Sequence, residues 1–140
     1  MSALSGSCAC GAVRFTASGE AGPAKACHCT TCRKQSGHYW VAVSAVRADI
    51  SVTGAEYVRW FKATDEARRG FCELCGSTLF WEKAGSDRMS FSAGALDGET
   101  GLRLAVHIYL AEKGDYYDIS DSVPCFAGSD VAASKEHAEE

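Results

Sequence analysis

The chain has 140 residues, 46% of them hydrophobic and 23% charged, which are ordinary values for a globular domain with a core of its own. A formal net charge of −4 argues against nucleic-acid binding, because that function needs a basic face to neutralise phosphates. No stretch suits a transmembrane helix, and the amino terminus lacks the basic and apolar regions of a signal peptide, so we expect a cytoplasmic protein whose thiols stay reduced.

Short runs of β-branched and aromatic residues between turn signals predict a mostly β protein. In chain order, the expected strands are residues 12–17, 39–46, 50–53, 57–61, 77–81, 89–92, 103–110 and 116–119. One short helical turn is expected at residues 30–36, capped by Thr30 or Thr31, which places Cys32 in its first turn. Strands so short and so closely spaced predict a small antiparallel sandwich or open barrel rather than a doubly wound α/β fold.

Seven of the eight cysteines fall into three tight clusters, which is the most informative feature of the chain. The clusters are Cys8 with Cys10, Cys27 with Cys29 and Cys32, and Cys72 with Cys75. Cysteines one or two residues apart direct thiolates onto one small ion and rarely suit structural disulfides. Seven thiolates fill one tetrahedral zinc site and leave a second site one ligand short, as in a catalytic zinc centre, so we predict two zinc ions per chain.

Two of the clusters carry a glycine directly after their second cysteine. Gly11 follows Cys10, and Gly76 follows Cys75. Glycine lets the backbone turn with positive φ and direct amide N–H groups at the sulfurs, which supports a bound metal. We predict that both clusters converge on one structural zinc, and we call Cys8, Cys10, Cys72 and Cys75 the four-cysteine site. The alternative is two unrelated pairs, one of them redox-active, but a redox Cys-x-x-Cys motif normally needs a thioredoxin-type frame that this chain lacks.

The third cluster, which we call the three-cysteine site, consists of Cys27, Cys29 and Cys32. Its neighbours Arg33 and Lys34, together with a helix N-terminus, favour thiolate over thiol. Three thiolates on a divalent ion leave a net charge of about −1, which suits binding of a further, exogenous thiolate better than generation of hydroxide. We therefore predict an open, catalytic zinc that binds and activates a small thiol.

Four residues are candidates for a further ligand of that zinc. His28 lies between two ligands and is expected to point away from the ion, as a surface or supporting residue. His38 and His107 could approach from elsewhere, although a histidine in a β-rich core is more often simply hydrogen-bonded. Cys125 is the main rival, but its Val-Pro-Cys-Phe segment has no glycine after the cysteine, so we expect the site to be open.

The ordered motifs resemble the glutathione-dependent formaldehyde-activating family, also called the centromere protein V family. The residues that carry the resemblance are Gly6–Phe15, Cys27–Arg33 with Ser36 and Gly37, Gly70–Ser77, and His107–Tyr109. The resemblance implies an all-β, tent-like domain over residues 5–126 built around two zincs, followed by a polar tail at 127–140 that we expect to fray. It assigns the four-cysteine site to the structural ion and the three-cysteine site to the catalytic ion.

The family's activity is a carbon–sulfur lyase reaction, run in reverse, that joins formaldehyde and glutathione as S-(hydroxymethyl)glutathione. We therefore expect a thiol to bind at the open zinc position as thiolate and attack an aldehyde carbonyl. In the reverse reaction, the thiolate is expelled from the adduct. Arg33 and Lys34 could steer a substrate carboxylate, and His38 could donate a proton or form a substrate wall. The other basic pair, Arg68 and Arg69, is expected to be solvated surface.

Two functions of other classes stay open. One is a non-catalytic, zinc-stabilised binding module, which closure of the second site by Cys125 would support. The other is a zinc or redox sensor, in which oxidation of the three-cysteine site releases its ion. Iron in place of zinc is a further alternative at such thiolate sites.

Overall fold

The computed structural model describes residues 3–130 and contains two sheets and one α-helix. The three-stranded antiparallel sheet has the order β1 (Leu4–Ser7), β2 (Arg14–Ala17), β5 (Ile50–Thr53). The seven-stranded sheet has the order β10 (Leu104–Ile108), β3 (Ala24–Cys27), β4 (Trp40–Val46), β9 (Arg88–Ser92), β8 (Thr78–Lys83), β7 (Ala67–Cys72), β6 (Val58–Phe61). Helix α1 spans Thr30–Ser36, and short 3-10 turns are Arg47–Asp49, Ala55–Tyr57, Ala93–Ala95 and Leu110–Glu112. No helix in this part of the chain has the length and hydropathy needed to span a membrane.

The expected fold class, mostly β with short antiparallel sheets and one helical turn, is confirmed. One strand pair departs from the antiparallel pattern, because β10 runs parallel to β3. Strands β1, β3 and β7 were not predicted, since they are rich in Ala, Gly, Ser, Lys and Arg, which have low β-propensity. The expected strand at 116–119 is wrong: this segment is irregular, and Tyr117 hydrogen-bonds to His28 instead of joining a sheet.

Two hydrophobic clusters hold the molecule together. The larger one includes Phe15, whose ring centroid lies 5.3 Å from that of Phe80 and 5.2 Å from that of Phe91. Phe15 comes from the three-stranded sheet and the other two rings from the seven-stranded sheet, so this contact joins the two sheets. The smaller cluster surrounds the three-cysteine site and includes Trp40, with Trp81 packed against it.

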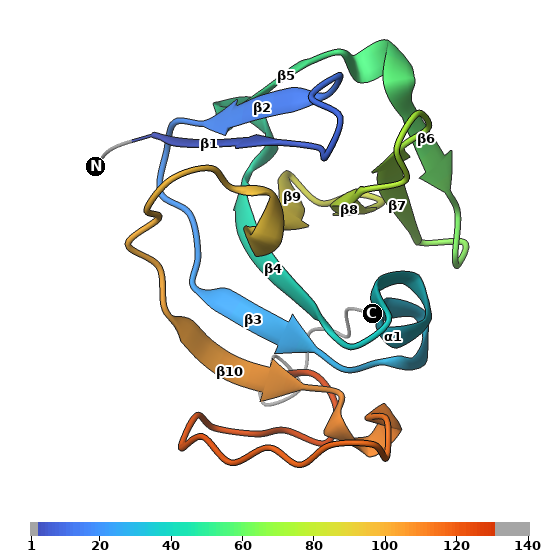
Figure 1. The fold of residues 1–140 in the computed structure, drawn as a ribbon, viewed down its shortest axis with the longest axis vertical. Coiled ribbons are helices and arrows are strands. Elements are labelled where there is room, and N and C mark those ends of the chain that lie inside the picture. The colour runs from blue at the N-terminus through green and yellow to red at the C-terminus, as the bar shows by residue number, and fades with distance from the viewer. Residues whose placement is uncertain (1–2, 131–140) are drawn as a thin grey trace.

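The strand connections place the cysteines (Figure 1). The first cluster lies in the turn between β1 and β2, and Cys72 ends β7 before the turn into β8. Strand β3 ends at Cys27 and leads directly into α1, which lies at the end of the molecule where β10 and the C-terminal segment also run. Thus the four-cysteine site connects the two sheets, and the three-cysteine site lies at the junction of β3 and α1.

The C-terminal segment follows β10. The backbone N–H of His107 donates to Pro124 O at 2.9 Å, and that of Phe126 donates back to His107 O at 2.9 Å. Residues 127–130, assigned from sequence to the tail, also contact the domain, because Lys25 Nζ lies 3.0 Å from Asp130 Oδ2. The remainder of the expected tail, 131–140, lies outside the described residues.

Candidate metal centres and substrate cleft

The four-cysteine site brings together sulfurs from two distant segments. All four Sγ atoms lie within 4.8 Å of one another. Cys10 Sγ is 3.6 Å from Cys8 Sγ and 3.8 Å from Cys72 Sγ. A tetrahedron of sulfurs about 2.3 Å from a central ion has edges of roughly 3.8 Å. The donor set therefore fits one tetrahedral zinc ion.

The two halves of this site have the same backbone geometry. Gly11 and Gly76 both have a φ of 82°, and each donates its N–H to the carbonyl of the first cysteine in its turn, at 3.0 and 2.7 Å. The turns also support the sulfurs, since Val13 N–H donates to Cys8 Sγ at 3.3 Å. The Ser77 hydroxyl, followed by the Ser77 backbone N–H, lowers the pKa of Cys75 to about 5. Both glycines thus have the conformation that the sequence predicted.

The three-cysteine site is formed by the end of β3 and the first turn of α1. Its three Sγ atoms lie within 4.8 Å of one another, and all three residues are buried. The helix N-cap is Cys29, not Thr30 or Thr31, because the Cys29 sulfur accepts a hydrogen bond from Cys32 N–H at 3.4 Å. One sulfur therefore both caps the helix and faces the site, which fixes the position of Cys32 in the first turn.

Arg69 corrects the expectation that both arginines of the Arg68–Arg69 pair are solvated. Arg69 is only 6% exposed, and its Nη1 donates to Cys32 Sγ at 3.3 Å. Arg68 is exposed, pairs with Glu82 at 2.9 Å and covers the Trp60 ring. Neighbouring residues of a strand point to opposite faces, so one arginine of a pair in β7 has to face inward. That alternation was the available signal, but β7 itself was not predicted.

The thiols of Cys29 and Cys32 have pKa values shifted in opposite directions. Hydrogen bonds from the Cys27 and Cys32 thiols, and then from the Cys32 N–H, lower the pKa of Cys29. The Cys27 thiol also lowers the pKa of Cys32, but the interaction with Cys29 and burial outweigh it and raise this pKa to about 12. Without a cation, the Cys29 thiolate thus suppresses ionisation of Cys32. Full ionisation needs a central positive charge, which a soft, thiolate-binding ion such as zinc would supply.

Within residues 3–130, no fourth His, Cys, Asp or Glu donor lies within reach of all three sulfurs. The Cys125 sulfur is exposed and donates to Val123 O at 3.5 Å. His28 is fully buried, not at the surface, and hydrogen-bonds to Tyr117 and to His107, whose Nδ1 lies 2.9 Å from His28 Nε2. Burial, and then the His107 ring, lower the pKa of His28 to about 4, so this imidazole is neutral at pH 7.

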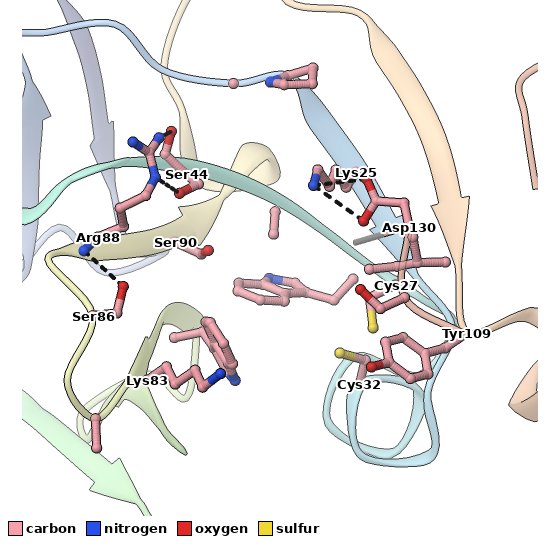
Figure 2. Close-up of a pocket in the computed structure, with 18 of the residues that line it drawn as sticks. Lys25, Cys27, Cys32, Ser44, Lys83, Ser86, Arg88, Ser90, Tyr109 and Asp130 are labelled. Atoms are coloured by element: carbon pink, nitrogen blue, oxygen red, sulfur yellow. Dashed lines mark hydrogen bonds and ion pairs between the residues drawn. The ribbon is translucent and has the colours of Figure 1, made fainter. Parts of the chain in front are cut away.

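A cleft of about 730 Å³ opens onto the sulfurs of Cys27 and Cys32 (Figure 2). Its apolar walls include Trp40, Trp81 and Ile108. Its polar lining includes Lys25, Ser44, Lys83, Arg88, Ser90 and Tyr109. A smaller cavity of about 240 Å³ reaches the same site from the side of Cys29 and Arg69. Small molecules can therefore approach the three-cysteine site from two directions.

The residues expected to bind substrate lie elsewhere. Arg33 donates to Glu112 O at 2.9 Å, Lys34 is exposed, and His38 is exposed against the ring of Tyr117. None of these three residues lines either cavity. The cations that line the larger cleft come instead from β3, β8 and β9. Sequence reasoning missed them because they are isolated basic residues on separate strands.

Replacing Arg69 with methionine is expected to weaken metal binding at the three-cysteine site by about 10- to 100-fold, because the Cys32 sulfur loses its hydrogen bond and its neighbouring positive charge. Competition against a chromophoric zinc chelator measures the change. The matched control is Arg68→Met, which removes an exposed arginine from the adjacent position and should leave the affinity unchanged. Equal effects of the two substitutions would contradict a specific role of Arg69.

Known proteins are similar to this chain in sequence. The model of the family described as "Glutathione-dependent formaldehyde-activating enzyme" matches residues 3–112. A Halomonas elongata protein named "Putative glutathione-dependent formaldehyde-activating enzyme" is 33% identical, with 89% of this chain and 87% of that protein covered. A Schizosaccharomyces pombe protein described as an uncharacterized lyase is 28% identical, covering 92% and 94% of the two chains.

Among solved structures, a crystal structure of a Rhodobacter sphaeroides protein is similar, with a TM-score of 0.56 and 25% identity, over 69% of this chain and 91% of that one. The matching family model covers most of the described residues, including both cysteine sites. The fold, the ordered cysteines and the match together show that this chain belongs to the glutathione-dependent formaldehyde-activating enzyme family.

Proposed function

We propose that this protein is a carbon–sulfur lyase that joins, or releases, a small glutathione-like thiol and a formaldehyde-like aldehyde. The reaction takes place at a zinc ion held by Cys27, Cys29 and Cys32. A second zinc, held by the four-cysteine site, stabilises the fold. The observation that carries the proposal is a set of three buried sulfurs, without a fourth protein ligand among the described residues, at the inner end of a large cleft.

The donor set agrees with the proposed chemistry. Three sulfurs are soft ligands that suit zinc, and an ion held by three protein ligands keeps a position for an exogenous one. Zinc bound there would supply a site at which a thiol loses its proton and binds as thiolate. Arg69 supports the proposal by donating to Cys32 Sγ, because it balances negative charge that would otherwise repel an incoming thiolate.

The cleft suits a thiol that carries carboxylates. Lys83 and Arg88 line it, and Arg88 is oriented by hydrogen bonds from Nε to Ser44 Oγ at 2.8 Å and from Nη2 to Ser44 O at 3.1 Å. Figure 2 shows both cations on the side of the cleft away from Cys32. A thiol bound at the sulfurs can therefore extend its carboxylates toward these cations, while the tryptophan walls exclude water from its reactive end.

Glutathione and formaldehyde also combine without a catalyst, so formation of the adduct alone does not show catalysis. The test therefore measures the rate of exchange between free glutathione and its adduct in a mixture that has already reached equilibrium. Exchange between free glutathione and its hydroxymethyl adduct, followed by NMR, should accelerate in proportion to the concentration of zinc-loaded protein. Calorimetry should show glutathione binding to the same sample. If the protein binds glutathione but the exchange rate in its presence equals the rate in buffer alone, the lyase activity is excluded and a binding module is favoured.

A further inference from the structure

Tyr109 has an unusual backbone conformation. Its φ of 61° and ψ of 39° make it the sole non-glycine residue with positive φ within residues 3–130. Tyrosine rarely adopts this left-handed conformation, because its Cβ crowds the following carbonyl. Hydrogen bonds fix it, since the Tyr109 N–H donates to Gly128 O at 2.9 Å and its carbonyl accepts from Glu112 N–H at 3.1 Å. Such backbone strain is often found at functional sites.

The conformation has a consequence for the cleft. Successive side chains of an extended strand point to opposite faces, so Ile108 and Tyr109 would normally diverge. Here both residues line the larger cleft, because the backbone turns at Tyr109. The smaller cavity is lined by Tyr109 as well. The strained backbone thus directs this ring to the place where the two cavities meet at the three-cysteine site.

The ring packs against the three-cysteine site. Figure 2 shows it beside the sulfurs of Cys27 and Cys32, with its hydroxyl at the cleft end of the ring. A phenol can donate a hydrogen bond and accept one. A molecule that reacts at the open face of these sulfurs would therefore have this hydroxyl next to its reacting atoms.

We infer that Tyr109 is a catalytic residue of the proposed lyase. Its hydroxyl protonates the oxygen of the aldehyde. In the joining direction, the substrate sulfur gives up its proton and forms a bond to the carbonyl carbon. The carbonyl π bond breaks, and the oxygen takes the phenolic proton. The proton released from the thiol restores the phenol, so the product is the neutral hydroxymethyl thioether. In the releasing direction, the carbon–sulfur bond breaks and the carbonyl forms, the phenol oxygen accepts the hydroxyl proton, and the proton that the phenol carried before goes to the departing sulfur. This inference rests on the proposed function.

Lys83 is the rival donor, because it also lines both cavities. Figure 2 shows its side chain across the cleft from Cys32, whereas Tyr109 adjoins Cys32. An ammonium group on the far side of the cleft is better placed to bind a substrate carboxylate than to protonate a carbonyl that reacts beside the sulfurs. We therefore expect Lys83→Met to weaken glutathione binding, and Tyr109→Phe to slow the exchange step without weakening that binding.

The test compares Tyr109→Phe with Tyr116→Phe, an exposed tyrosine that lines neither cavity. Exchange between glutathione and its hydroxymethyl adduct should slow about 100-fold in Tyr109→Phe, as for loss of a general acid, with zinc content and glutathione affinity unchanged. Tyr116→Phe should match the wild type. A wild-type rate in Tyr109→Phe, or a loss of glutathione affinity as large as the loss of rate, would overturn the role of Tyr109. Absence of acceleration by the wild type would instead overturn the proposed function.

The contact between Tyr109 and the substrate oxygen can also be tested by ligand binding, without catalytic turnover. S-(2-hydroxyethyl)glutathione carries a hydroxyl near the position of the adduct oxygen, and S-propylglutathione replaces that hydroxyl with a methyl group. Calorimetry should show about a tenfold preference of the wild type for the hydroxyl compound, which Tyr109→Phe should lose. The same preference in both proteins would contradict contact between Tyr109 and the substrate oxygen.

Discussion

Replacing Cys72 with serine is expected to release the ion of the four-cysteine site and to destabilise the protein by several kcal/mol or more. Cys72 is fully buried, and its sulfur lies 3.8 Å from that of Cys10, which is 62 residues away in the chain. A metal that connects such distant segments constrains the unfolded chain strongly. The same site joins the turn before β2 to the end of β7, so its loss uncouples the two sheets.

Native mass spectrometry should find one metal ion fewer in the variant, and urea unfolding should show a large fall in the midpoint. The matched control is Cys125→Ser, since Cys125 is exposed and outside both cysteine sites. That variant should keep the wild-type metal content and unfolding midpoint. Retention of both ions by Cys72→Ser, with an unchanged midpoint, would contradict the structural role of the four-cysteine site.

Replacing Cys32 with serine is expected to abolish catalysis while leaving most of the fold intact. Cys32 supplies one of only three protein sulfurs to the proposed catalytic ion and accepts the hydrogen bond of Arg69. Losing the ion removes the group that binds the thiol, so exchange should slow by about 1,000-fold or more. The four-cysteine site is separate, and stability should fall less than in Cys72→Ser.

Metal analysis of Cys32→Ser should give one ion per chain in place of two, and calorimetry should show no glutathione binding. Far-UV circular dichroism and the unfolding midpoint report whether the fold persists. Cys125→Ser again serves as the control and should keep both binding and exchange. If Cys32→Ser bound glutathione as tightly as the wild type, the thiol would have to bind elsewhere.

The amino-acid sequence by itself determined the features that depend on local spacing. Each cysteine cluster spans a few residues, and Gly11 and Gly76 report the turn conformation of their own segment. Helix α1 was likewise predictable from its short local pattern. Even the pairing of two distant clusters followed from ligand number and from their shared glycine, because a tetrahedral ion needs four donors.

The tertiary structure alone decided which other residues surround the three-cysteine site. Arg69 reaches Cys32 only because β7 aligns it there, and Lys83 and Arg88 meet in the cleft from neighbouring strands. Strand β3 forms from weak β-formers because β4 and β10 pair with both its edges. Such residues lie far from the cysteines in sequence, so no local pattern marks them. Sheet register brings these residues together, and the backbone turn at Tyr109 adds the Tyr109 ring to the same site. Both features arise from long-range packing and hydrogen bonding.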